Sequence, residues 1–238
     1  MKYLRNLIAF ITLTLASLSL FHCNAYDIMG QMYSPSPLRV FVTTQTSMGD
    51  MKFFQVAPAL WKVSQCMGTG IDNANCVCQQ LAMNNGLANN GARYKAWLSD
   101  ASTDAICNIV GKTGTFSSSQ CGGFTSNGAP YVDVNYNPLF NSWEDIRSGK
   151  TPDRTIIIQE NRVPVATTFQ SIWTGSGDNG TGTNVTCNSW TDAGTPGTYG
   201  GIGYLDTPTN WSVYHSTITP PPTAICNVYY PVYCFEQP

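Results

Sequence analysis

The sequence predicts an exported domain of the α+β class, and three observations lead to that prediction. Two short stretches have helical periodicity, while several others alternate in the manner of strands. Hydrophobic residues make up 42% of the 238 and aromatic residues 12%, which is enough to bury a core and excludes global disorder. Nine cysteines accompany a charged fraction of only 11%, a combination that favours an oxidising compartment.

Residues 1–25 are typical of an export signal. Lys2 and Arg5 precede an apolar run over residues 7–21, which is too short for a spanning helix of about 20 residues. Without Lys2 and Arg5, the chain has ten basic and fourteen acidic residues, which gives a net charge of −4. No basic block is present, so binding of nucleic acid through its phosphates is excluded.

Two processing sites are possible in the signal. Residues 20–23 have the outline of a bacterial lipobox, so the signal could end at residue 22 with Cys23 lipidated, although His22 is bulkier than the usual residue there. Cleavage after Ala25 would instead release a protein without lipid. Both routes remove Cys23 from the folded domain, and the eight remaining cysteines suit four disulfides.

A tether and a strand follow the signal. Residues 26–37 end at two prolines and have the composition of a linker. From residue 38 the apolar residues Leu38, Val40 and Val42 recur at every second position, which predicts a strand over residues 38–43.

The first helix is expected over residues 73–83, capped by Asp72 or Asn73. One apolar face carries this prediction: Ala74, Cys78, Leu81 and Ala82. A short strand is expected over residues 94–98.

A second helix begins after Ser142, whose hydroxyl can cap its first turn, with Asp145 three residues later and Trp143 and Ile146 facing inward.

The remainder is expected to consist of strands and long loops. Residues 156–158 and 169–173 are strand candidates, and glycines interrupt the chain repeatedly after Trp173. Tyr230, Val232 and Cys234 form an alternating last strand. No internal repeat and no second domain boundary are visible, so residues 38–238 are predicted to form a single domain.

Four blocks in this region resemble endostatin, the C-terminal domain of collagens XV and XVIII. In chain order they are CQQLA (78–82) with ARYKAWLS (92–99), LFNSWEDIRSG (139–149), IWTG (172–175) with CNSWT (187–191), and Cys226 with YCFE (233–236). Together with the strand at 39–43, the Thr- and Asn-rich composition and the export signal, they are most similar to the leptospiral endostatin-like surface proteins.

This resemblance implies a C-type-lectin-like fold displayed on the bacterial outer membrane, in part secreted. It implies binding of the host complement regulator factor H and of matrix proteins such as laminin and fibronectin, without a cofactor. The heparin and zinc sites of endostatin are not expected here, because the arginine-rich face and the N-terminal histidines are missing.

The resemblance also implies two disulfides, Cys78–Cys234 and Cys187–Cys226. The other four cysteines have no counterpart in endostatin, and we pair them by proximity in the sequence as Cys107–Cys121 and Cys66–Cys76.

No catalytic or metal site is expected. His215 is the one histidine left after export, and no nucleophile-elbow motif accompanies it. Cys76 and Cys78 favour disulfides over zinc in an exported chain. Residues 178–181 offer oxygen ligands of the kind that calcium takes, but Asp-Asn-Gly is also ordinary turn chemistry.

Partner binding is expected in the loop-rich region 191–225. Tyrosine and tryptophan on loops suit protein recognition, since they are large and rigid. The candidates are Tyr199, Tyr204, Trp211 and Tyr214. The alternative for this region is a loop that only packs onto the domain, and the alternative function is a glycan- or small-ligand-binding module.

Overall fold

The computed structural model describes residues 35–52, 66–116, 121, 123–166, 170–212 and 223–238, without the side chain of Asn90. The chain divides into two units, residues 1–36 and 37–238. The expected export signal, Cys23 and most of the tether lie outside the described residues. Within the described part of the chain, no helix is long and apolar enough to span a membrane.

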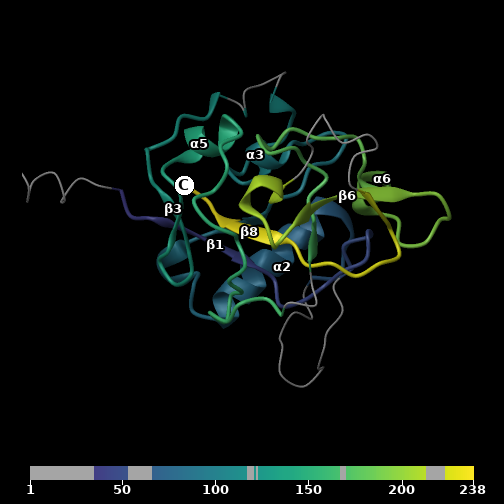
Figure 1. The fold of residues 1–238 in the computed structure, drawn as a ribbon, viewed down its shortest axis with the longest axis horizontal. Helices are drawn as coiled ribbons and strands as arrows, with labels where there is room; N and C mark the ends of the chain where they lie inside the picture. Colours follow the sequence, from purple (N-terminus) through teal and green to yellow (C-terminus); the bar gives the residue numbers. More distant parts are fainter. Residues whose placement is uncertain (1–34, 53–65, 117–120, 122, 167–169, 213–222) are drawn as a thin grey trace, which may run out of the picture. The chain divides into compact units, whose positions relative to one another are not determined.

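The larger sheet has the strand order β2-β8-β1-β3-β4. Its strands are β1 (Leu38–Val42), β2 (Tyr94–Ala96), β3 (Tyr131–Asp133), β4 (Pro138–Phe140) and β8 (Tyr233–Glu236). β1 and β3 are parallel, whereas the other neighbours are antiparallel. Figure 1 shows β8 running beside β1 through the middle of this unit.

A smaller antiparallel sheet has the order β5-β6-β7. It consists of β5 (Ser171–Trp173), β6 (Tyr199–Tyr204) and β7 (Thr223–Ile225). The Trp173 amide donates to the Pro231 carbonyl over 3.0 Å, which joins this sheet to the segment that leads into β8.

The helical elements confirm the α+β class. The two expected helices are present as α2 (Gly70–Asn84) and α5 (Trp143–Arg147). Four short elements were not predicted: α3 (Ala105–Asn108), η1 (Asn89–Gly91), α6 (Cys187–Trp190) and η2 (Pro208–Asn210).

Both faces of the larger sheet are covered, which divides the core in two. On one face the β1 residues Val40 and Val42 pack with Trp143 and Ile146 of α5. On the other face the β1 residue Phe41 packs with the apolar side of α2 and with Trp173. All of these side chains are buried, so β1 lies in the interior on both of its faces.

The cap expected for α2 is wrong, whereas the cap of α5 is confirmed. α2 begins at Gly70, so Asp72 and Asn73 lie inside the helix. Asn73 instead donates to the Met51 carbonyl over 2.6 Å and accepts from the Gly68 amide, which holds the preceding loop against the helix. At α5, Ser142 Oγ accepts from the Asp145 amide as expected.

The strand predictions need three corrections. Residues 156–158 form no strand, and only Ile158 takes part in an isolated bridge, because the chain turns back on itself at residues 159–162. The last strand begins at Tyr233, not at Tyr230. Residues 199–204, expected as glycine-rich loop, form the strand β6. Phe169 lies outside the described residues.

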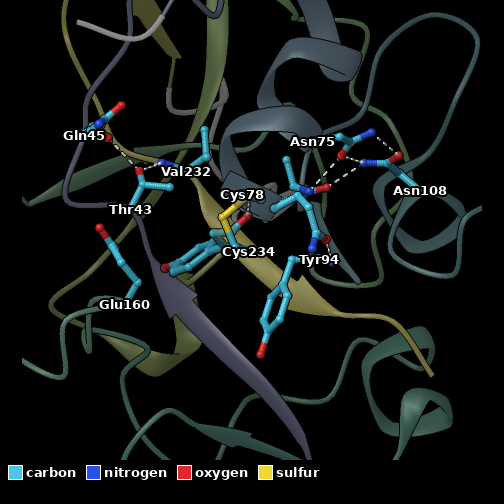
Figure 2. Close-up of a disulfide and its surroundings, with 12 residues drawn as sticks. Thr43, Gln45, Asn75, Cys78, Tyr94, Asn108, Glu160, Val232 and Cys234 are labelled. Atoms are coloured by element: carbon cyan, nitrogen blue, oxygen red, sulfur yellow. Dashed lines mark hydrogen bonds between the residues drawn. A yellow bond between two sulfur atoms is a disulfide. The ribbon is translucent and has the colours of Figure 1, made fainter. Parts of the chain in front are cut away.

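The free edge of β2 is closed by side-chain amides instead of a further strand (Figure 2). Asn75 Oδ1 accepts from the Ala96 amide over 2.9 Å, and Asn108 Nδ2 donates to the Ala96 carbonyl over 2.7 Å. Asn75 and Asn108 also bond each other twice. Gln79 Oε1 accepts from the Tyr94 amide over 2.8 Å. The Tyr94 amide and both backbone groups of Ala96 are therefore already bonded, so this edge is a poor template for another strand.

Four disulfides hold the domain together, and they are the four pairs that the sequence suggested. Cys78–Cys234 joins α2 to β8 (Figure 2) and Cys187–Cys226 joins α6 to the residue after β7. Two further bridges close short segments, Cys66–Cys76 and Cys107–Cys121. The longest closure spans 156 residues, and so joins α2 to the C-terminal strand.

Candidate functional site

Of the predicted partner-binding residues that the structure describes, Tyr199 is the most accessible. It is 48% exposed at the start of β6, and Ile225 of β7 lies directly opposite it in the antiparallel register with 46% exposure. Residues opposite each other in such a pair place their side chains on the same face. Tyr199 and Ile225 therefore form an adjacent pair of large exposed side chains.

The prediction for Trp211 is wrong. Its side chain is 1% exposed and packs among Trp97, Phe140 and Tyr233, with ring centroids 4.9, 5.4 and 5.8 Å away. A loop tryptophan adjacent to so many aromatic residues gains more from burial than from exposure. Tyr204 is half-buried against the α2 side of the core, which leaves it little surface for a partner. Tyr214 and His215 lie outside the described residues.

A hollow of about 420 Å³ lies beside Tyr199. Its lining contains amide, hydroxyl and small apolar side chains, namely Ala101, Asn184, Val185, Thr186, Asn188, Ser189, Thr198 and Tyr199. None of these residues carries a charge. We call Tyr199, Ile225 and this hollow the Tyr199 surface.

One wall of the hollow is a left-handed turn. The four residues of α6 all have positive φ, between 47° at Cys187 and 60° at Trp190. This conformation costs L-residues roughly 1–2 kcal/mol each, so it must be held by its surroundings. Three contacts hold the turn in this conformation. The Cys187–Cys226 disulfide fixes its start, Trp190 Nε1 donates to the Ser99 carbonyl, and the Ser189 amide donates to Thr186 Oγ1.

The glycines of β6 allow the turn to pack closely. A Cβ atom at Gly200 would lie 2.7 Å from Cys187 Sγ, and one at Gly203 would overlap the Trp211 carbonyl oxygen. Only glycine fits where the backbone comes so close to its neighbours. The Tyr199 surface therefore rests on β6, a strand whose glycines made it look like a loop in the sequence.

The loop proposed as a calcium candidate folds as a turn. Asn179 Oδ1 accepts from both the Thr181 amide and its hydroxyl, and the Gly180 amide donates to the Gly177 carbonyl over 2.8 Å. Across the described parts of the chain, histidine, cysteine, aspartate and glutamate never gather in groups of three or more that could hold a metal ion.

Glu160 is a buried carboxylate, with 1% of the residue exposed. The Thr44 amide donates to its Oε2 over 3.0 Å, and the Thr44 hydroxyl bonds its Oε1. Burial raises the pKa of Glu160, and the bonds from Thr44 offset part of that rise. Figure 2 shows it on the β1 side of the disulfide, away from the asparagine pair.

A pH dependence of stability follows from Glu160. Because its pKa is higher in the folded than in the unfolded state, the folded protein binds more protons between the two values. The resulting stabilisation is complete below the ordinary carboxyl pKa and is lost as pH rises through the raised value. We expect Glu160→Gln to remove this decline, as measured by urea midpoints from pH 4 to pH 8.

The control for this experiment is Glu144→Gln, because Glu144 is an exposed carboxylate on α5. This variant should retain the decline of stability with rising pH that Glu160 causes. Parallel profiles for Glu160→Gln and wild type would show that Glu160 does not contribute.

In comparisons with known proteins, no family model matches this chain, and no curated protein is similar to it at a significant level.

Proposed function

We propose that this protein is an exported, non-catalytic binding protein of the bacterial surface that holds partner proteins through the Tyr199 surface. The observation that carries the proposal is the exposed pair Tyr199 and Ile225, presented on a sheet that a disulfide fixes in place. Large rigid side chains on a fixed frame lose little entropy on binding, which is why they dominate protein interfaces.

The fold is proposed to be C-type-lectin-like, of the endostatin type. Two features support this: a helix joined to the last strand by Cys78–Cys234, and a second bridge, Cys187–Cys226, across the glycine-rich region. The partners expected from the resemblance to leptospiral endostatin-like proteins are host factor H, laminin and fibronectin. Anchoring to the outer membrane through a lipidated Cys23 belongs to the same proposal.

The double variant Tyr199→Ser/Ile225→Ser tests the binding surface. Loss of two central apolar contacts should weaken binding to immobilised factor H, laminin or fibronectin by about tenfold or more in biolayer interferometry. Both residues are exposed, so the variant should stay folded.

The matched control is Tyr136→Ser/Val163→Ser, which removes two comparably exposed apolar side chains elsewhere, at 61% and 53% exposure. Binding by this variant should equal that of the wild type. Equal binding by all three proteins would refute the assignment of the surface.

A neutral glycan is the second candidate ligand, and the lining of the hollow favours it. Asn184 and Asn188 present exposed amides beside the Tyr199 ring, and the lining contains no charged residue. Sugar hydroxyls bond to such amides while a ring face packs on the aromatic side chain. A glycan array probed with the wild type and with Asn188→Ala separates this ligand from a protein partner.

A further inference from the structure

A long groove borders the edge strand β2, away from the residues that define the Tyr199 surface. Two adjoining hollows of about 640 and 530 Å³ form it. They share Gly91, Ala92, Arg93, Lys95 and Gln237 in their linings, so the two hollows lie next to each other along β2. α2 borders the first hollow, and the residues after α3 border the second.

Three cations face this groove: Arg93, Lys95 and Lys112. Within the described residues none of them forms an ion pair, whereas three other cations of the domain do, at Arg39, Lys52 and Lys150. One acidic side chain, Asp72 of α2, also borders the groove. The groove is positive in a chain whose overall formal charge is −2.

The spacing of these charges suits an extended chain. Arg93 and Lys95 are two residues apart in extended backbone, so their side chains leave the same face roughly 7 Å apart. An extended peptide repeats its own side chains at the same interval. Carboxylates at alternate positions of a bound segment could therefore meet successive cations.

The first hollow has an apolar part near the C-terminal end of α2, at a distance along the helix from Asp72. Met83, 56% exposed, and Ala88 line it there. Methionine adapts its flexible side chain to varied apolar groups. A ligand that fills both parts needs carboxylates along most of its length and an apolar side chain at one end.

We propose that this groove binds an extended acidic segment of a partner polypeptide, with an apolar residue seated against Met83. This site is separate from the proposed Tyr199 surface, and the two can be tested independently. The free edge of β2 is already bonded by Asn75, Asn108 and Gln79. The segment therefore binds through its side chains and does not extend the sheet.

The test uses a fluorescein-labelled peptide, Leu-Asp-Ser-Asp-Ser-Asp, and its neutral counterpart with asparagine at each aspartate. Fluorescence anisotropy should show binding of the acidic peptide alone, weakening as salt rises, because the cations are exposed or half-buried. The variant Arg93→Glu/Lys95→Glu/Lys112→Glu should lose about tenfold or more in affinity, since three attractions become repulsions.

The control variant is Lys52→Glu/Lys150→Glu/Arg154→Glu, which changes the net charge equally but outside the groove. It should bind the acidic peptide as the wild type does. Equal losses in both variants, binding of the neutral peptide, or binding of a sulfated oligosaccharide but not of the peptide would each overturn the proposal. Because Tyr199→Ser/Ile225→Ser leaves the groove intact, that variant should bind the peptide normally even if the Tyr199 surface has another role.

Discussion

Removal of the Cys78–Cys234 disulfide, as Cys78→Ala/Cys234→Ala, should lower the free energy of unfolding by about 5 kcal/mol. The bridge closes a segment of 156 residues, and in the chain-entropy model the stabilisation grows with the length of that segment. Since native domains are stable by only about 5–15 kcal/mol, the variant should be largely or partly unfolded at 37 °C.

Cys107→Ala/Cys121→Ala is the matched control. All four of these cysteines are buried, but the second bridge closes only 14 residues and should be worth about 3 kcal/mol. Urea unfolding of both variants, with thiol titration to show that the other bridges have formed, measures the difference. Equal losses would contradict the view that the Cys78–Cys234 bridge stabilises the domain by closing the longer segment.

Asn75→Leu should destabilise the domain by about 4 kcal/mol. The substitution keeps the bulk of the side chain but leaves the Ala96 amide and the Asn108 amide group without the acceptor they share. Asn75 and Asn108 are nearly fully buried, so water cannot readily replace that acceptor, and each unsatisfied donor costs about 1–3 kcal/mol. The free energy of unfolding in urea measures this effect.

Asn84→Leu tests whether the loss is specific to the bonded amide. Asn84 lies on the same helix but is exposed, so its replacement should change the free energy of unfolding by less than about 0.5 kcal/mol. A similar small effect at Asn75 would mean that the amide pair does not maintain the β2 edge.

The elements with a local signal were predictable from the sequence. The α5 cap needs only Ser142 and, three residues later, Asp145, and the strand at β1 shows in its alternation. Phe41 lies on the opposite face of β1 from Val40 and Val42, where the alternation predicts exposure, and is nonetheless buried. Its burial depends on α2, which covers that face and is distant in the sequence, so no local pattern could reveal it.

The candidate site was harder to predict, because packing between segments distant in the sequence decides which of its aromatic side chains are exposed. Trp211 and Tyr199 have the same kind of sequence surroundings, yet one is buried among aromatic rings and the other is exposed. The glycines of β6 have the pattern of a loop, but they are there because Cys187 and Trp211 approach the strand closely. No sequence motif marks the groove beside β2, since Lys112 comes from another segment than Arg93 and Lys95 and only the fold brings the three cations together.

The most direct test of the central claim is a pull-down from human serum with the oxidised protein. The wild type and the Tyr136→Ser/Val163→Ser control should both recover factor H, whereas Tyr199→Ser/Ile225→Ser and reduced, alkylated protein should not. Failure of the folded wild type to recover it, or equal recovery by the Tyr199→Ser/Ile225→Ser variant, would contradict a partner-binding role for the Tyr199 surface in complement evasion.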